Sequence, residues 1–298
     1  MPFGVAVSGG ADSLALMLLC HAFRPGQFEV ATVDHGLRAD SAAEAALVAK
    51  LCDQLGIRHA TLPVEVSGGN LQDAARTARY AALGRWARDR GLVALATAHH
   101  GDDQAETVVM RLNRGSGISG LSGIRPMTSH PGTGIAIFRP LLSWSKEELT
   151  KIVTGAGISP ATDPSNVDPR FDRAQVRAAL KGADWLNPLA IARSAALLHE
   201  SDLALGWIAA QVWDRTIAYA DEAVEWRPQD EPRAVRLRIL ARAIAEAGGT
   251  GFTMSGVARL HDAIINQDVR GGTLAGVQLS VRKGTWTFRR APPRATVG

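Results

Sequence analysis

The stretch with the clearest capacity for chemistry is Ser8-Gly9-Gly10-Ala11-Asp12-Ser13, close to the start of the chain. It separates an apolar run that ends at Val7 from a second apolar run over residues 14–19, which predicts a turn between a strand and a helix that starts near Asp12 or Ser13. Two glycines let backbone N–H groups point at a ligand without interfering side chains. The helix N-terminus adds partial positive charge, so the turn predicts a phosphate site, with a plain glycine turn as the alternative.

A second stretch, His99-His100-Gly101-Asp102-Asp103-Gln104-Ala105-Glu106-Thr107, combines two histidines with three carboxylates. If a helix begins near Asp102, then Asp103 and Glu106 are three residues apart and share one face. Two carboxylates on one helical turn can hold Mg²⁺ through water or bind an ammonium group. Ordinary electrostatics at a helix start is the alternative, and the sequence leaves open which histidine contacts a substrate.

Two shorter motifs carry weaker signals. Asp34-His35-Gly36 follows an apolar run and predicts a loop that frames an adenine or a sugar, although an Asx-capped turn would have the same spelling. Arg76 and Arg79 fall in a helical pattern. A planar guanidinium that faces the site could neutralise a polyphosphate or an adenylate, whereas arginines on helices are usually solvated.

These motifs need a scaffold that brings strand ends together. Apolar runs predict strands at residues 28–33, 59–64 and 92–96, and helical spacing predicts helices at 41–55, 70–90 and 102–112. Strands that alternate with helices and are almost continuously apolar indicate an α/β fold, a doubly wound and mostly parallel sheet covered on both faces. Ligands in such sheets bind beyond the carboxyl ends of the strands, so the three loops should converge on one crevice.

The rest of the chain changes character along its length. Residues 115–123 are too rich in glycine and serine for a stable helix, and residues 162–173 form an irregular polar stretch. A short strand at 135–142 and a helix at 146–156 lie between them. Beyond residue 184 the pattern predicts helices at 188–219, 233–246 and 253–266, then a hairpin of strands 276–281 and 285–289. We therefore expect a catalytic domain at 1–184 and a smaller, mainly helical domain at 185–298.

Composition narrows the class of protein. The chain has 298 residues, 46% of them hydrophobic and 21% charged, with a net charge of +4, so it should fold and could bind an anionic partner. Its two cysteines, Cys20 and Cys52, fall in apolar helical patterns and are expected to be buried, reduced thiols. No apolar run reaches the ~20 residues of a membrane span, so we expect a cytoplasmic protein, and the true start could lie upstream of Met1.

Taken together, the motifs resemble those of the tRNA(Ile)-lysidine synthetase family within the N-type ATP pyrophosphatases, over residues 5 to about 177. The later motifs that carry this resemblance are Asp34-His35-Gly36-Leu37-Arg38, Ala78-Arg79-Tyr80, Arg114-Gly115-Ser116-Gly117, Arg139-Pro140-Leu141-Leu142 and Asp163-Pro164-Ser165-Asn166-Val167-Asp168. The resemblance implies that free lysine is ligated to C2 of the wobble cytidine in the CAU anticodon of an isoleucine tRNA. An adenylated cytidine would be the intermediate, AMP and pyrophosphate would be released, and ATP and Mg²⁺ would be required.

The resemblance also implies roles for individual residues. Asp12, Arg79, Asp103 and Glu106 would be catalytic, with Asp12 beside the metal. Asp103 and Glu106 would recognise the lysine amine or help to hold metal. The residues that would bind ATP are Ser8, Gly9, Gly10, Ala11, Asp12, Ser13, Asp34 and His35. The residues that would shape the nucleoside end of the site are Asp163, Ser165, Asn166, Asp168, Arg173 and Arg177.

Two features depart from the family's pattern. Members of the family often carry Arg-Asn where this chain has Arg173-Ala174, and longer members have additional C-terminal domains. Contacts to the body of the tRNA would then come from residues after 185, with Arg233, Arg236, Arg238 and Arg242 as candidates and a solvated helix face as the alternative. The sequence leaves open whether the protein forms a homodimer. A tRNA thiolase would need more cysteines, and a nucleotide sensor would need neither the acidic pair nor the polar stretch.

Overall fold

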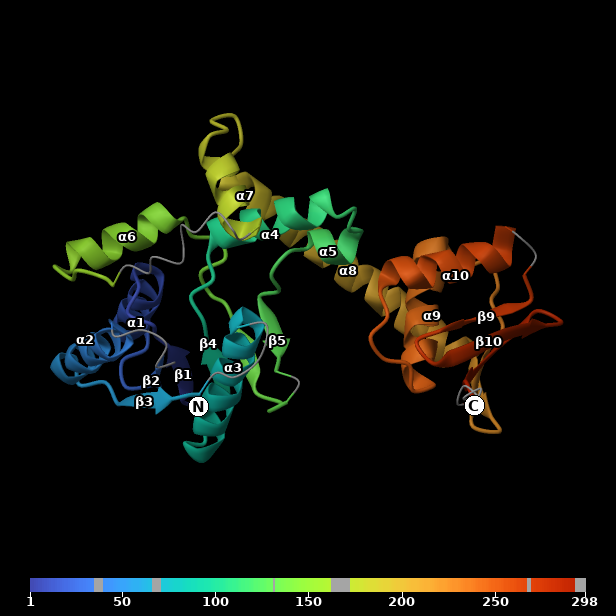
Figure 1. The fold of residues 1–298 in the computed structure, drawn as a ribbon, viewed down its shortest axis with the longest axis horizontal. Helices are drawn as coiled ribbons and strands as arrows, with labels where there is room; N and C mark the ends of the chain where they lie inside the picture. Colours follow the sequence, from blue (N-terminus) through green and yellow to red (C-terminus); the bar gives the residue numbers. More distant parts are fainter. Residues whose placement is uncertain (35–39, 66–70, 131, 162–171, 267–268, 293–298) are drawn as a thin grey trace, which may run out of the picture. The chain divides into compact units, whose positions relative to one another are not determined.

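A computed structural model of the chain describes residues 1–34, 40–65, 71–130, 132–161, 172–266 and 269–292. Two compact units, Met1–His199 and Glu200–Gly298, make up the fold (Figure 1). Among the described residues, no helix combines the length and the apolar character that crossing a bilayer requires.

The first unit alternates strands and helices, as the sequence predicts. Its strands are β1 (Phe3–Ala6), β2 (Phe28–Asp34), β3 (His59–Pro63), β4 (Ala94–Ala96), β5 (Met127–Ser129) and β6 (Ala136–Phe138). Its helices are α1 (Ala11–Phe23), α2 (Asp40–Gln54), α3 (Leu71–Asp89), α4 (Gly101–Asn113), α5 (Ile118–Leu121), α6 (Lys146–Gly155), α7 (Asp172–Lys181) and the start of α8 (Pro188–Thr216).

The strands form one sheet in the order β3-β2-β1-β4-β6-β5. All neighbours are parallel except β5, which runs antiparallel to β6 at the edge. The chain proceeds outward from β1 through β2 to β3, and then returns to place β4 on the other side of β1. This reversal of strand order between β1 and β4 is the point at which doubly wound sheets bind their ligands.

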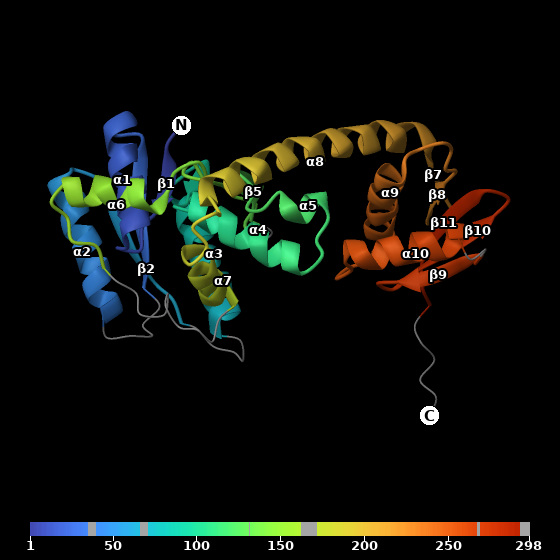
Figure 2. The same ribbon diagram turned by 90° about the horizontal axis from the view of Figure 1, so that it is seen from above.

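Helices cover both faces of this sheet, which confirms the predicted fold class. Val5 and Val30 pack in a core shared with α1, α2 and α6. Ala31 and Leu95 point to the opposite face and pack with α3 in a second core. Figures 1 and 2 show α3 on one side of the strands and α1, α2 and α6 on the other. Because successive strand residues point to opposite faces and both faces are covered, most strand positions are apolar.

The second unit is a five-stranded antiparallel sheet packed with two further helices and with the C-terminal part of α8, which contributes Val212 and Trp213 to the core. Its elements are β7 (Ile217–Ala220), β8 (Ala223–Trp226), α9 (Arg233–Glu246), α10 (Met254–Asn266), β9 (Gly271–Leu274), β10 (Val277–Arg282) and β11 (Thr285–Arg290), with strand order β7-β8-β11-β10-β9. The predicted terminal hairpin is confirmed as β10 and β11. Trp226 and Phe288 are fully buried in the core of this unit.

The helix predicted over residues 188–219 ends earlier, at Thr216, because β7 follows directly. Asp221 and Glu222 join β7 to β8 with φ angles of +47° and +58°. Two-residue hairpin turns need such positive φ values and usually draw on glycine or asparagine, so the Asp-Glu pair gives no turn signal in the sequence. The compact first unit extends to His199, while the functional division at residue 184 remains a prediction.

Candidate active site at the ends of β1 and β4

The glycine turn joins the end of β1 to the start of α1. Gly9 has a φ of +85°, and Gly10 is the N-cap residue of α1. The Ser13 hydroxyl stabilises the turn because it donates to the Gly10 carbonyl at 2.9 Å and accepts from the Ser8 backbone N–H at 3.1 Å. The backbone at the start of α1 is therefore held at the switch point of the sheet, where helix N–H groups favour an anion.

A histidine from the β4 loop meets an aspartate from this turn. His100 Nε2 lies 3.5 Å from Asp12 Oδ2 and 3.4 Å from Asp103 Oδ2. Its other ring nitrogen, Nδ1, lies 3.5 Å from Asp102 Oδ2. The loops after β1 and β4 therefore converge, as the fold predicts, and one imidazole lies among three carboxylates.

Burial and charge act in opposite directions on His100, whose side chain is 4% exposed. Burial by itself would lower the pKa of this imidazole, but Asp102, Asp12 and Asp103 outweigh burial and raise the pKa to about 10. His100 is therefore an imidazolium at neutral pH. It offsets the repulsion among the carboxylates and has no free lone pair with which to accept a proton.

The neighbouring His99 has the opposite character. Its Nδ1 lies 3.0 Å from the Thr97 hydroxyl. Burial lowers the pKa of His99 to about 3, and the nearby guanidinium groups of Arg139 and Arg79 contribute in the same direction. His99 is therefore neutral at physiological pH, and the two adjacent histidines differ in charge because their surroundings differ.

The acidic pair on α4 is engaged by two arginines from α7. Asp103 Oδ1 accepts from Arg173 Nη2 at 2.7 Å. Glu106, whose side chain is 3% exposed, accepts from Arg173 Nε at 2.6 Å and from Arg177 Nε at 2.5 Å. The structure thus brings together four of the residues that the sequence singled out. The carboxylates predicted to bind an ammonium group are already paired with guanidinium groups.

Arg79 belongs to a cationic cluster around a buried tyrosine on α3. The guanidinium carbons of Arg76 and Arg79 each lie 5.1 Å from the centre of the Tyr80 ring. Burial would raise the pKa of Tyr80, but Arg79 and Arg76 outweigh burial and lower it. Arg139 adds a further positive charge near Tyr80 and His99. This concentration of positive charge is suited to a phosphate-bearing ligand.

Residues far along the chain pack against the start of α4 and hydrogen-bond to it. The Gly101 backbone N–H donates to the Trp144 carbonyl at 2.8 Å. A Cβ at Gly101 would lie 2.6 Å from the Leu189 side chain and 3.0 Å from the Trp144 carbonyl oxygen, so only glycine fits without displacement. This close packing fixes the helix start that presents His100 and Asp103.

Sequence reasoning missed two residues that organise the loop after α4. The Gln104 side chain donates to the Ile124 carbonyl at 3.1 Å and accepts from the Ile124 N–H. Arg111 Nη1 donates to the carbonyls of Gly120 and Gly123 at 2.7 and 2.9 Å. The glycine-rich stretch, predicted to be a loop, therefore contains one helical turn, α5, which side-chain donors from α4 stabilise. Nothing in the spacing of Gln104 and Arg111 indicates these long-range partners.

Of the remaining predicted site residues, one lies at the end of a strand and the others lie outside the residues that the structure describes. Asp34 is the last residue of β2, and its carbonyl accepts from the Val64 N–H at 2.8 Å. The predicted residues that lie outside the described part of the chain are His35, Asp163, Ser165, Asn166 and Asp168.

Asp12 is the residue that best fits a metal ligand. Its Oδ1 is buried and has no hydrogen-bond partner among the described residues, so it is available to a cation. Within those same residues, no group of three or more His, Cys, Asp or Glu side chains is arranged to hold a metal ion. Mg²⁺ commonly binds through one or two carboxylates together with substrate phosphates, and a single aspartate beside a helix N-terminus that favours an anion fits that mode.

The two thiols are poorly suited to sulfur chemistry. Burial raises the pKa of Cys20 and of Cys52 to about 11. A thiol acts as a nucleophile or a metal ligand as its thiolate, which such a pKa disfavours at neutral pH. Cys52 instead contacts Met17 Sδ at 3.7 Å within the core of the first unit.

Comparisons with known proteins agree with this geometry. The sequence profile of the PP-loop domain matches residues 2–183. A tRNA(Ile)-lysidine synthase from Novosphingobium aromaticivorans is 48% identical over 97% of this chain and 88% of that protein. One from Zymomonas mobilis is 40% identical over 98% of this chain and 89% of that protein. The solved structure of the U34-tRNA thiolase NcsA from Methanococcus maripaludis shares the fold, with a TM-score of 0.55 at 18% identity over 67% of this chain and 72% of the thiolase.

Proposed function

Because the chain belongs to the tRNA(Ile)-lysidine synthase family and carries its PP-loop ATP-binding domain, we propose that it ligates free lysine to the wobble cytidine of an isoleucine tRNA with a CAU anticodon. In the first step, the cytidine C2 oxygen attacks the α-phosphorus of ATP and pyrophosphate leaves. In the second, the lysine Nε attacks C2, and AMP leaves with the former C2 oxygen. The product is lysidine, and the ligase forms a carbon–nitrogen bond.

The glycine turn is proposed to hold the triphosphate. Backbone N–H groups at the start of α1, with the hydroxyls of Ser8 and Ser13, would contact phosphate oxygens. Asp12 would hold Mg²⁺ together with those oxygens, and the ion would supply charge stabilisation for the leaving pyrophosphate. Asp34 and His35 would frame the nucleoside of ATP, and Arg79 would stabilise the charge that develops during adenylation.

The acidic pair is proposed to recognise the lysine substrate. An ammonium group can take the place of one guanidinium at Asp103, because both present N–H donors to the same carboxylate oxygen. Arg173 Nη2 would then be freed from Asp103 to face the adenylated cytidine, whose phosphate is a suitable counter-charge, while Arg173 Nε stays on Glu106. Glu106 would keep Arg177 in place throughout, since it accepts from Arg177 at 2.5 Å. Asp163, Ser165, Asn166 and Asp168 complete the nucleoside end of the site in this proposal.

The amine must lose a proton before it attacks, because the ordinary pKa of lysine is about 10.4. His100 already carries its proton at neutral pH, and His99 has a pKa of about 3, so neither is suited to take it.

Residues 185–298 are proposed to bind the body of the tRNA, and the cytoplasm is the expected location of the protein.

The single observation that carries the proposal is the contact of His100 with both Asp12 and Asp103. It unites the phosphate-binding turn with the acidic pair in one site. An ATP site alone would need the turn, whereas ligation also needs a second substrate site beside it.

The test is incubation of the protein with purified CAU-anticodon tRNA(Ile), ATP and labelled lysine. We expect label in the tRNA and one AMP for each lysine incorporated. Asp12→Asn should abolish AMP formation, whereas Asp53→Asn, an exposed aspartate on α2, should retain it. Turnover that depends on a sulfur donor would indicate a thiolase, and no tRNA-dependent ATP–pyrophosphate exchange would indicate a nucleotide sensor.

A further inference from the structure

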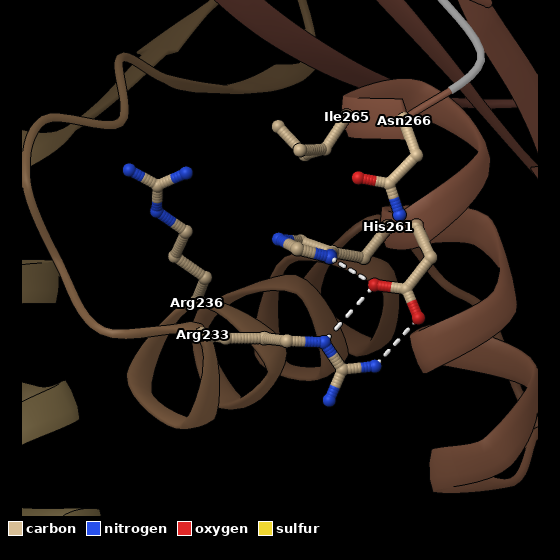
Figure 3. A pocket seen from close by; sticks show the side chains of 6 residues that line it. Arg233, Arg236, His261, Ile265 and Asn266 are labelled. Carbon is tan, nitrogen blue, oxygen red and sulfur yellow. Dashed lines mark hydrogen bonds and ion pairs between the residues drawn. The ribbon is translucent and has the colours of Figure 1, made fainter.

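A cavity of about 340 Å³ lies between α9 and α10 in the second unit (Figure 3). Its lining residues are Arg233, Arg236, His261, Asp262, Ile265 and Asn266. Two arginines therefore reach it from α9, and a histidine and an aspartate reach it from α10. This grouping of cations around open space is the feature to explain.

The four arginines that the sequence suggested as phosphate contacts separate into two classes. Arg238 is committed to Asp202 at 2.6 Å, and Arg242 lies 4.1 Å from the centre of the Trp213 ring. Both therefore have structural partners within the unit. Arg233 and Arg236 are the two that line the cavity.

His261 is the central residue of the cavity. Its side chain is 4% exposed, and its Nδ1 lies 2.8 Å from Asp262 Oδ1. Its Nε2 is buried without a hydrogen-bond partner in the described part of the chain. Figure 3 shows this free ring edge turned toward the space beside Arg236. A buried ring nitrogen without a partner is costly, so a ligand group that pairs with it would be favoured.

The charges around the cavity indicate which ligand would pair. Asp262 accepts from Nε and Nη2 of Arg233, at 3.0 and 2.6 Å. The hydrogen bond from Arg233, followed by that from His261, lowers the pKa of Asp262 to about 2. Asp262 is thus ionised and already neutralised. It favours a proton on His261 Nδ1 and leaves the Nε2 edge to face the ligand.

Arg236 supplies the second positive group. Its Nη2 donates to the Gln229 carbonyl, and its Nε lies 3.8 Å from Glu231 Oε2 and has no hydrogen-bond partner among the described residues. Glu231 lies too far away for a hydrogen bond to that N–H. The Nε donor is therefore available to an acceptor. With one proton on Nδ1 directed at Asp262, His261 offers a second donor at Nε2 only as the imidazolium, which is the form that a bound anion favours.

We propose that this cavity binds one phosphodiester group of the tRNA substrate, held by Arg236 and by the Nε2–H of His261 in its imidazolium form. The inference rests on the proposed function for its ligand. Beside the two cations, Ile265 is 49% exposed and Asn266 contributes an amide, so an attached ribose would meet both an apolar and a polar neighbour. A phosphodiester accepts two hydrogen bonds at once, which matches two donors from different helices.

The experiment uses the full chain and a fluorescent CAU-anticodon tRNA(Ile) transcript, with binding measured between about 50 and about 200 mM salt. His261→Asn keeps an amide donor where Nδ1 meets Asp262 but removes the Nε2 edge. His261→Gln places an amide nitrogen near the former Nε2 and serves as its partner variant. Arg236→Gln removes the second cation, and Arg259→Gln, exposed on α10 outside the cavity, is its charge-matched control.

We expect His261→Asn and Arg236→Gln to weaken tRNA binding on the order of tenfold and to lower the salt slope by about one. His261→Gln should retain more affinity than His261→Asn, and Arg259→Gln should resemble the wild type. Equal affinity of His261→Asn and His261→Gln would overturn the inference. So would binding of inorganic phosphate that His261→Asn abolishes without loss of tRNA affinity.

The two proposals fail separately in this design. A wild-type protein that binds the transcript but incorporates no lysine would refute the proposed function, while the salt slopes would still report on the cavity. A protein that makes lysidine with unchanged slopes in every variant would refute the cavity alone.

Discussion

Replacement of His100 by asparagine tests the charge arrangement at the centre of the candidate active site. His100→Asn keeps a small polar residue at the N-cap of α4 but removes the only imidazolium among Asp12, Asp102 and Asp103 in the described structure. Three carboxylates then face one another without the cation that lies within 3.5 Å of each. We expect the first unit to lose stability in a manner that depends on pH.

The magnitude follows from the pKa of His100. A rise from the ordinary value of 6.5 to about 10 corresponds to roughly 5 kcal/mol of folding free energy, at about 1.4 kcal/mol for each pKa unit. Because the folded-state pKa is raised, this contribution is complete below pH 6.5 and disappears as the pH rises toward 10. The difference between wild type and variant should therefore shrink by about 1.4 kcal/mol for each pH unit in that window.

The assay is urea unfolding in the presence of EDTA, so that Asp12 carries no metal, at several pH values between about 6 and about 9. His59→Asn is the matched control in the same unit. Burial lowers the pKa of His59, which makes its contribution sensitive to pH only below 6.5. An effect of His100→Asn that is equally large at every pH would show that the imidazole acts by packing alone, and would refute the charge argument.

Four further substitutions have expected outcomes. Gly9→Ala should destabilise the fold by about 1 kcal/mol or more and raise the KM for ATP, because an alanine is strained at a φ of +85°. Gly10→Ala, whose new Cβ would be 3.7 Å from its nearest neighbour, should change the free energy of unfolding by less than about 0.5 kcal/mol in the same denaturation experiment. Arg111→Met leaves two carbonyls without their side-chain donor and should cost roughly 2 kcal/mol, seen as a lower Tm. Glu106→Gln should raise the KM for lysine about tenfold or more while ATP–pyrophosphate exchange continues, and loss of exchange instead would assign Glu106 to adenylation.

Much of the first unit could be predicted because its signals are local. Apolar runs such as Val30 and its neighbours predict buried parallel strands, and the glycine turn predicts the helix that follows β1. The convergence of Asp12 with Asp103 followed from topology, since both loops leave the carboxyl ends of adjacent strands. The pairing of Glu106 with Arg177 could not be anticipated, because that ion pair joins residues 71 positions apart.

The opposite protonation states of His99 and His100 also could not be predicted from the sequence. The two residues are adjacent and chemically identical, and only their neighbours in space distinguish them. In the second unit, the hairpin at Lys283-Gly284 was found because it has a typical turn spelling, whereas the one at Asp221-Glu222 was missed because it does not. A turn can be predicted from the sequence where glycine supplies the positive φ. It cannot be predicted where tertiary packing imposes that φ on another residue.

The close contact of Leu189 with Gly101 affects where the chain can be truncated to obtain an active fragment. Leu189 lies beyond the last residue matched by the PP-loop profile, at 183, yet its side chain packs against the start of α4. A recombinant fragment cut at the profile boundary would leave the base of that helix uncovered, and its loss of activity would be mistaken for a missing substrate-binding region. A truncation intended to isolate the chemistry should retain the chain through His199.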